Sequence, residues 1–202
     1  MNFREARIHA HVCSDGWLSE YIEKHVLQVV HGRRYYRDRR RYEVGYANNE
    51  KKLLKEFDDD MNVVFGVRCK RNTGERRTKS KRIFTRLKKL GAGKSKEWFI
   101  GAEIIRSNKK TKRVWLRAFF DDEGTVDLKE KRIRIKIKNE SGVKQAAKML
   151  STLGIESQIT GENRDETWFL TINRKNAARF KKLVGFNQTK KKRLLKKIVG
   201  AR

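Results

Sequence analysis

Hydrophobic and charged positions alternate along residues 132–139, RIRIKIKN, and this two-residue period predicts a strand with one apolar and one basic face. Two further runs, IESQIT and ETWFLTIN, predict strands separated by the turn GENRDE. Residues 139–153 instead repeat apolar side chains at helical spacing, and the predicted helix ends at Gly154. Its apolar stripe consists of Val143, Ala146, Ala147 and Leu150. Residues 175–184 predict a further short helix, so the C-terminal half is expected to alternate strands and helices.

The first half of the chain has a less regular pattern. Residues 16–42, GWLSEYIEKHVLQVVHGRRYYRDRRRY, mix strand and helix signals, and we predict a loop at the run RRYYRDRRR. This run is the densest cationic patch of the sequence. Arginine beside tyrosine suits contacts with phosphate and sugar, and a disordered basic loop is the alternative.

The segment ARIHAHVCSDGWLS, residues 6–19, allows two interpretations. Its HxH and SDG letters resemble the first motif of the PHP metal hydrolases, in which two strand-borne histidines hold a metal ion. The chain has only four histidines, all in its first 31 residues, so it lacks the set that such a multinuclear site needs. As a helix, the segment places Ala6, Ala10 and Ser14 on a narrow stripe where a second helix can pack closely. We therefore predict a helix, with His9 and His11 packed or solvated beside the stripe.

Residues 116–124, LRAFFDDEG, repeat the pattern of residues 8–16, IHAHVCSDG. The two segments share an apolar start, a small residue, a final acid and a glycine. We predict that each glycine stops a helix, because glycine adopts the left-handed conformation that is common after the last turn. Asp15 and Glu123 then lie at helix C-termini, where the helix dipole favours cations. Two carboxylates in such positions indicate a hard divalent cation between them.

This pair of motifs resembles the LAGLIDADG homing endonucleases, in the single-chain form that carries two motifs. The resemblance extends to a strand and amphipathic helix at residues 41–67, a joining segment at residues 90–105 and a final helix at residues 184–198. It implies an α+β fold, a pseudo-twofold repeat of αββαββα in which two antiparallel sheets form a DNA-binding saddle around a central helix pair. The implied halves of this compact monomer are residues 1–105, with the motif at 8–16, and residues 106–202, with the motif at 116–124.

The resemblance also implies a site. Asp15 and Glu123 would be catalytic and would bind Mg²⁺ or Mn²⁺, with Ser14 and Asp122 completing the ligand shells through backbone carbonyls. The family places a lysine near each scissile phosphate, and the best matches are Lys94 and Lys190. Ala10, Ser14 and Ala118 would form the helix interface. The expected DNA-binding residues are Arg33, Arg34, Tyr35, Arg37, Arg39, Arg40, Arg41, Arg132, Arg134, Lys136 and Lys138.

Three positions depart from the family pattern. Asp122 replaces a small residue opposite Ser14, which indicates a looser or locally polar helix contact. Cys13 stands where the first motif usually has an acid, and Ile100–Gly101 stands where the joining segment usually has proline. None of these changes removes an expected metal ligand.

The net charge is +28, from 52 Lys and Arg against 24 Asp and Glu in 202 residues. Such an excess favours a partner dense in negative charge, most commonly nucleic acid, with an anionic membrane surface as the alternative. No apolar run approaches the ~20 residues that span a bilayer, and the N-terminus lacks an apolar signal segment. We therefore expect an intracellular protein, cytoplasmic or organellar, with no membrane partner. Cys13 and Cys69 have no metal-binding or disulfide spacing and are expected to be buried.

These observations predict a site-specific double-strand DNA endonuclease of the homing type, intron-encoded or free-standing. It would hydrolyse one phosphodiester in each strand of a long asymmetric target, with a divalent metal. A non-cleaving or bifunctional intron RNA maturase on the same fold is the alternative. A basic ribosomal or structural RNA-binding protein would explain the charge but not the repeated motif.

Overall fold

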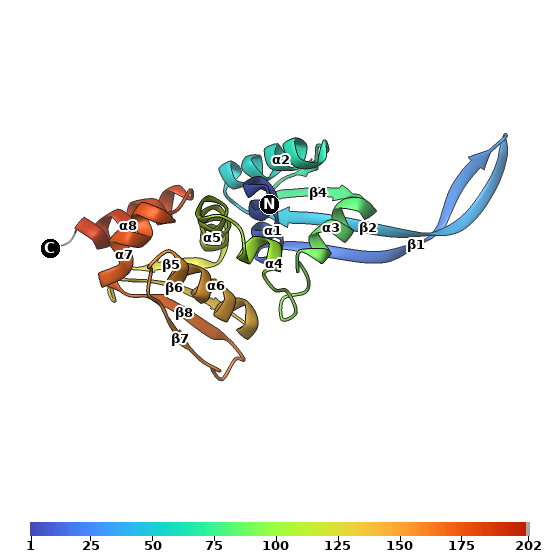
Figure 1. The fold of residues 1–202 in the computed structure, drawn as a ribbon. Helices are drawn as coiled ribbons and strands as arrows, with labels where there is room; N and C mark the ends of the chain where they lie inside the picture. The colour runs from blue at the N-terminus through green and yellow to red at the C-terminus, as the bar shows by residue number, and fades with distance from the viewer. Residues whose placement is uncertain (201–202) are drawn as a thin grey trace.

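The computed structural model describes residues 1–200, which form two halves side by side (Figure 1). The first half contains α1 (Phe3–Cys13), β1 (Gly16–Val30), β2 (Arg33–Ala47), α2 (Lys51–Phe65), β3 (Lys70–Asn72), β4 (Glu75–Lys79), α3 (Lys81–Lys89) and α4 (Ala102–Ile105). The second contains α5 (Lys109–Glu123), β5 (Gly124–Asp127), β6 (Arg132–Ile137), α6 (Glu140–Thr152), β7 (Gln158–Thr160), β8 (Trp168–Ile172), α7 (Arg174–Leu183) and α8 (Thr189–Gly200). Residues 201 and 202, which belong to the predicted C-terminal half, lie outside the described residues.

The two sheets have the same topology. Their strand orders are β1-β2-β4-β3 and β5-β6-β8-β7, and every neighbouring pair is antiparallel. Each half thus follows the order αββαββα and then adds one helix, α4 or α8. The predicted α+β pseudo-repeat is confirmed. The boundary at residue 105 stays a prediction, although α4 ends there and α5 begins at Lys109.

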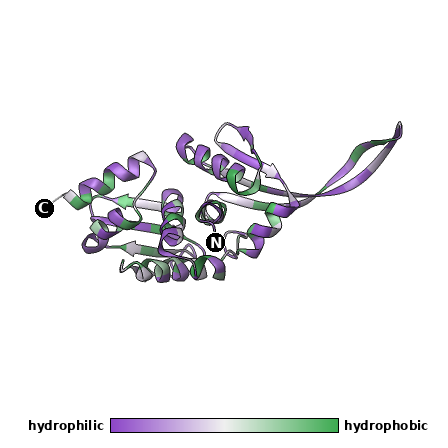
Figure 2. Cartoon of the chain, turned by 45° about the horizontal axis from the view of Figure 1, so that its top comes forward, coloured by the Kyte–Doolittle hydropathy of each residue, from purple (hydrophilic) through white to green (hydrophobic). Residues whose placement is uncertain are grey.

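The apolar face of each sheet packs against helices to form the core. Figure 2 shows hydrophobic residues, in green, within the strands and helices of both halves. In β6 the alternation works as predicted, because Ile133 and Ile135 are fully buried while the basic positions between them face outward. The predicted helix at 139–153 is α6, in which Val143, Ala146 and Leu150 are buried. No helix within residues 1–200 is long and apolar enough to cross a membrane.

The joining segment explains one departure from the family pattern. The main-chain N–H of Ile100 donates to Gln145 Oε1 at 2.6 Å, and the N–H of Gly101 donates to the Leu90 carbonyl at 2.8 Å. Proline at either position would remove one of these donors. Asn139 donates from Nδ2 to the Trp98 carbonyl at 2.6 Å, so this segment is fastened to the second half.

The predicted loop at RRYYRDRRR is wrong, because these residues form most of strand β2. Strands β1 and β2 make one long hairpin that projects beyond the body of the protein (Figure 1). Its turn is His31–Gly32, and both residues have positive φ, at 47° and 75°. This geometry is that of a two-residue hairpin turn whose twist matches the twist of the strands. The pattern of residues 16–42 was irregular because both faces of the hairpin are exposed to solvent, so no buried face imposes an alternation.

Candidate active site and nucleic-acid interface

The two motif helices, α1 and α5, pack against each other at the centre of the molecule (Figure 1). Ala10 of α1 and Ala118 of α5 are buried, and Ser14 is half-buried as the C-cap of α1. The Ser14 hydroxyl donates to the Ala10 carbonyl at 2.9 Å and therefore stays within its own helix. Small side chains on both helices allow the close packing that places the two motif ends together.

The motif glycines act differently from the prediction. Neither Gly16 nor Gly124 has positive φ, and each is the first residue of the strand that follows its motif helix. A Cβ at residue 16 would lie 2.6 Å from Val12 Cα and 2.7 Å from the Gly45 carbonyl oxygen. A Cβ at residue 124 would lie 2.4 Å from the Phe120 carbonyl oxygen. Glycine is required at both positions by close backbone approach and not by a left-handed conformation.

Asp15 and Glu123 lie where the two motif helices end. Asp15 follows Ser14, the C-cap of α1, and Glu123 is the last residue of α5. Desolvation by the surrounding chain and the nearby Asp122 carboxylate raise the pKa of Asp15 to about 6, although its side chain is partly open to solvent. Burial and the Asp15 carboxylate raise the pKa of Glu123 to about 7. The two carboxylates therefore repel each other across the seam between the halves, as the sequence predicted for their positions.

Asp122, beside Glu123, is the centre of a hydrogen-bond network. Its side chain is fully buried and accepts from Tyr46 Oη at 2.7 Å, from Asn48 Nδ2 at 3.3 Å and from His11 Nδ1 at 2.8 Å. Asn48 Nδ2 also donates to Asp15 Oδ2 at 3.0 Å, which connects the network to the first motif. The expected locally polar helix contact is therefore present, and both side-chain oxygens of Asp122 have partners.

The two motif histidines are fully buried in the helix contact, so they are packed and not solvated. Burial opposes protonation of His11, but the charge and hydrogen bond of Asp122 outweigh it and raise the pKa of His11. His9 is in the opposite situation, because burial lowers its pKa to about 3. Its Nδ1 accepts a hydrogen bond from Trp115 Nε1 at 3.0 Å. Each histidine thus makes one polar contact from α1 to α5, and the pair does not form an HxH clamp.

Lysine 191 reaches the site from α8. Its amine donates to the carbonyl oxygens of Asp121 at 2.5 Å and Asp122 at 3.0 Å, at the C-terminal end of α5. The predicted Lys190 is exposed, and within residues 1–200 its side chain makes no hydrogen bond or ion pair with Asp15 or Glu123. The helical stripe indicates which neighbouring lysine faces α5, because Lys191 is four and seven positions before the buried Leu195 and Ile198.

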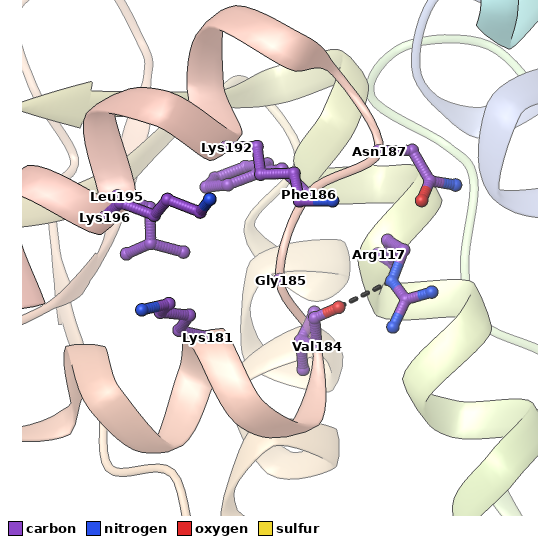
Figure 3. A pocket seen from close by; sticks show the side chains of 9 residues that line it. All are labelled: Arg117, Lys181, Val184, Gly185, Phe186, Asn187, Lys192, Leu195 and Lys196. Atoms are coloured by element: carbon purple, nitrogen blue, oxygen red, sulfur yellow. Dashed lines mark hydrogen bonds between the residues drawn. The ribbon is translucent and has the colours of Figure 1, made fainter.

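A short loop before α8 fixes the position of that helix. The Asp121 carboxylate accepts from the main-chain N–H groups of Asn187 and Gln188, both at 2.9 Å. Arg117 Nε donates to the Val184 carbonyl at 2.6 Å, beside a small pocket that Lys181, Lys192 and Lys196 also line (Figure 3). The loop at residues 184–188 is therefore held on α5 from both ends. Sequence reasoning missed Asp121, since nothing in its neighbourhood distinguished it from the other motif acids.

The first lysine that we expected near the acids lies elsewhere. Lys94 is exposed in the loop between α3 and α4, where its carbonyl accepts from the N–H groups of Glu97 at 2.8 Å and Trp98 at 3.1 Å. Within residues 1–200, no hydrogen bond or ion pair connects its side chain with Asp15 or Glu123.

An open groove of about 580 Å³ lies beside Asp15. Asp15, Asn48 and Thr73 of the first half line it together with Asp122 and Gln188 of the second, whereas Glu123 does not line it. Within residues 1–200, no three His, Cys, Asp or Glu side chains are grouped closely enough to hold a metal ion by themselves. The groove therefore gives a large partner access to the Asp15 carboxylate, whose pKa is raised.

The outward faces of both sheets are basic. In β6 the predicted residues are mostly engaged: Lys136 pairs with Asp165 at 2.6 Å, and Arg134 lies over the Phe169 ring at 4.3 Å. On the first sheet, a hollow of about 340 Å³ is lined by basic residues that the sequence did not single out. These are Arg68, Lys70, Arg77 and Lys79, around the carboxylate of Glu43. The hairpin arginines at 33–41 continue this face outward.

Comparison with known proteins agrees with the fold. Residues 110–185 match the family model of a LAGLIDADG-like domain. The homing endonuclease I-DmoI in complex with DNA and Mn aligns with a TM-score of 0.62 and 18% identity, over 90% of this chain and 96% of that chain. The homing endonuclease I-WcaI bound to its DNA recognition sequence aligns with a TM-score of 0.57 and 13% identity, over 90% of this chain and 80% of that chain.

A third similar structure is the full-length DUF199/WhiA protein from Thermatoga maritima, with a TM-score of 0.54 and 13% identity. It covers 96% of this chain and 60% of that chain. No curated protein matches the sequence significantly. Residues 110–185 are therefore similar to a LAGLIDADG-like domain, and over nine-tenths of its length the chain shares the fold of the homing endonuclease I-DmoI.

Proposed function

We propose that this protein is a site-specific double-strand DNA endonuclease that hydrolyses one phosphodiester in each strand with the help of Mg²⁺ or Mn²⁺. The observation that carries the proposal is the position of Asp15 and Glu123, one from each half, at the ends of the two packed motif helices, where the Asp15 charge acts on Glu123. One carboxylate from each half suits the hydrolysis of one strand at each half-site. The solved complexes of similar fold with DNA and Mn support the same chemistry.

The donor set fits a hard divalent cation. Asp15 and Glu123 would hold it, with the carbonyl oxygens of Ser14 and Asp122 as further candidate ligands. Two carboxylates and a few carbonyls do not make a closed cage, but Mg²⁺ commonly takes one or two carboxylates and completes its shell with water and phosphate oxygens. A bound ion supplies an activated water and neutralises charge on the phosphate oxygens.

The residues around the acids have supporting roles in this proposal. Asn48 orients the Asp15 carboxylate through its 3.0 Å hydrogen bond. Asp122 holds the two motif helices together by its side chain, and both side-chain oxygens are already engaged. The Lys191 ammonium contributes positive charge where a negatively charged phosphate would approach the end of α5. Lys94 and Lys190 remain proposals as lysines near the scissile phosphates.

The basic sheet faces would bind the duplex across both halves of a single monomer. The proposed contacts are the hairpin residues Arg33, Arg34, Tyr35, Arg37, Arg39, Arg40 and Arg41, and the β6 side Arg132, Arg134, Lys136 and Lys138. A protein that contacts ~6–10 phosphates loses ~10³–10⁵ in affinity between ~50 and ~200 mM salt. We expect a salt response of this size, and a flat response would contradict the basic interface.

The test of cleavage uses charge-neutral variants of the two acids. The substrate is a duplex in which the DNA sequences on either side of the gene are joined, with the intervening segment removed. Asp15→Asn and Glu123→Gln are each expected to abolish cleavage in Mg²⁺ while leaving duplex binding intact. The matched control is Asp59→Asn, an exposed acid on α2 that pairs with Lys55. Cleavage at the wild-type rate by either acid variant would overturn the assignment.

The second candidate is a non-cleaving or bifunctional intron RNA maturase on this fold. The Lys191 amine favours it, because a cation of the chain already lies on the Asp122 carbonyl, a candidate metal ligand. Stimulated splicing of the intron RNA, without cleavage of the joined duplex, would support the maturase. Cleavage of the duplex without any effect on splicing would support the endonuclease alone.

A further inference from the structure

The hairpin of β1 and β2 extends well beyond the sheet that it begins. Strand β4 pairs with β2 only from Glu43 to Ala47, so from Tyr42 outward β2 has β1 as its single neighbour. We call residues 21–41 the arm. Each of its strands covers about ten residues, which at ~3.3 Å per residue is roughly 30 Å, close to one turn of B-form DNA.

The arm keeps one face aligned with the outward face of the sheet. Side chains of a strand alternate between its two faces, so residues 33, 35, 37, 39 and 41 of β2 lie on the same face as Glu43 and Gly45, and the buried Val44 and Tyr46 lie on the other. The bulge in the hairpin adds its extra residue to β1, where residues 24 and 25 are both opposite Asp38, and the alternation along β2 is unchanged. The face that carries Arg33, Arg37 and Arg39 therefore continues the basic hollow of β3 and β4.

The charge of the arm is not neutralised internally. Residues 21–41 contain seven Lys and Arg side chains against two carboxylates, Glu23 and Asp38. Arg41 pairs with Glu23, but within residues 1–200 no carboxylate lies at ion-pair distance from Arg33, Arg34 or Arg37. Exposed aromatic and aliphatic side chains lie between these charges, with Tyr35 49% and Tyr36 67% exposed.

The second half has no equivalent of the arm. Its first hairpin pairs only four residues of β5 with β6, whereas β1 and β2 pair thirteen. The basic residues of β6 are also largely matched by the second half's own groups, as in the pairs Lys136–Asp165 and Arg132–Asp127. The pseudo-twofold symmetry of the sheets therefore does not extend to their outer ends.

We propose that the arm binds double-stranded DNA outside the segment covered by the two sheets, so that the footprint extends by about one helical turn on the side of the first half only. This inference rests on the proposed function. A two-stranded ribbon fits the major groove of B-form DNA, and arginines with free guanidinium groups contact its phosphates. The site would thus be long and asymmetric because of the protein's shape as well as its base contacts.

Charge distinguishes DNA from the other partners that an exposed ribbon can take. A second copy of the chain would bring two arms of like charge together, and the seven cationic groups would repel. The continuity of the basic face, from the hollow of β3 and β4 to the tip, also matches one extended polyanion better than a separate protein.

The test compares two triple variants with the same change of charge. Arg33→Gln, Arg37→Gln and Arg39→Gln alter the arm, while the control Lys51→Gln, Lys52→Gln and Lys89→Gln alters exposed residues of α2 and α3. Affinity for a 60-base-pair duplex of random sequence is measured from ~50 to ~300 mM salt. The arm variant is expected to lower the slope of log affinity against log salt by about 2–3 and the control by less than about 1, since each phosphate contact contributes ~0.9.

A hydroxyl-radical footprint on the joined flanking duplex locates the effect. The arm variant is expected to lose protection over ~10 base pairs at one end only, while the control keeps the wild-type footprint. Equal slopes for the arm variant and wild type, or equal losses for both variants, would overturn the inference and leave the proposed function intact. A wild-type protein that binds neither duplex would overturn the proposed function itself.

Sedimentation of the free protein gives the remaining outcome. The wild type and the arm variant are both expected to sediment as monomers. A wild-type dimer that the arm substitutions dissociate would assign the arm to self-association and contradict the proposal. Unchanged circular dichroism of both triple variants shows that their folds are comparable, which is expected because all six side chains are exposed.

Discussion

The amine of Lys191 donates a hydrogen bond to the main-chain carbonyl oxygen of Asp122 at 3.0 Å, so a cation of the chain itself lies at the C-terminal end of α5. Helix C-termini carry partial negative charge, and an ammonium there is stabilising. The same charge lowers the pKa of Asp15 and of Glu123, against the larger effect of burial. Lys191 thereby keeps the two acids closer to ionisation than their surroundings alone would.

Removing that charge is expected to raise the pKa of Glu123 above about 7, and the pKa of Asp15 above about 6. Lys191→Met makes this change, and Lys190→Met is the matched control because its side chain is exposed one position earlier. The measurement is a carboxyl ¹³C NMR titration of metal-free protein. Identical titration curves for Glu123 in both variants would contradict the role of Lys191.

The raised pKa values also predict how stability depends on pH without metal. Both carboxyls have a higher pKa in the folded protein than in the unfolded chain, so between about pH 4 and pH 7 the folded state holds protons that the unfolded chain releases. Their contribution to the free energy of unfolding therefore falls as pH rises through this range. Glu123→Gln removes the part of this decrease in the free energy of unfolding that comes from residue 123.

We expect the stability advantage of Glu123→Gln over wild type, measured by urea unfolding in EDTA, to grow from pH 4.5 to pH 8. Taking the difference between variant and wild type cancels the other titrating groups. A difference that is constant with pH would contradict the raised pKa. Metal binding should strengthen over the same range, because the ligands must lose their protons.

Asp122→Ala is expected to destabilise the fold by ~3–5 kcal/mol, because it leaves the buried His11 imidazole without the carboxylate that pairs with it. It also removes the acceptor of the Tyr46 hydroxyl. Asp59→Ala removes an exposed pair with Lys55 and should cost less than ~0.5 kcal/mol. Urea unfolding measures the free energy of unfolding of the two variants. Similar losses would show that the buried His11–Asp122 pair stabilises the fold no more than the exposed Lys55–Asp59 pair.

Gly16→Ala is expected to destabilise the protein by ~1–3 kcal/mol, because its Cβ would overlap Val12 Cα and the Gly45 carbonyl in rigid backbone. Gly93→Ala is the control, since a Cβ there meets its nearest atom, the Trp98 nitrogen, at an ordinary 3.6 Å. Thermal unfolding distinguishes the two. If both variants unfold at the same temperature, the close approach behind the motif glycine is not limiting.

The second half was predictable because each of its elements buries one face. Ile133 and Ile135 face the core of β6, and Val143 and Leu150 face it from α6, so the hydrophobic period survives in the sequence. The arm has no buried face, and its strand character appears only in the structure. The repeated motif located Asp15 and Glu123, because an acid at a helix C-terminus is unusual in any sequence.

The rest of the site depends on distances across the fold. Lys191 and Lys190 are neighbours in a lysine-rich run, and only the orientation of α8, which the loop held by Asp121 determines, decides which of them reaches the acids. Tyr46 and Asn48 come to Asp122 from the end of β2, more than seventy positions away in the chain. His11 carries no local sign that its partner is an acid of the other half.

The two motif helices contribute different polar groups to the contact between them. Helix α1 contributes the imidazoles of His9 and His11, and α5 contributes the Trp115 indole and the Asp122 carboxylate. If two copies of α1 paired in the same way, His11 would face Ser14 and have no anion. If two copies of α5 did so, the buried Asp122 carboxylate would face Phe119, the equivalent of His11, and have no imidazole partner. The halves are consequently no longer interchangeable. Supplied as separate polypeptides, they should assemble as a mixed pair, and neither fragment should replace the other.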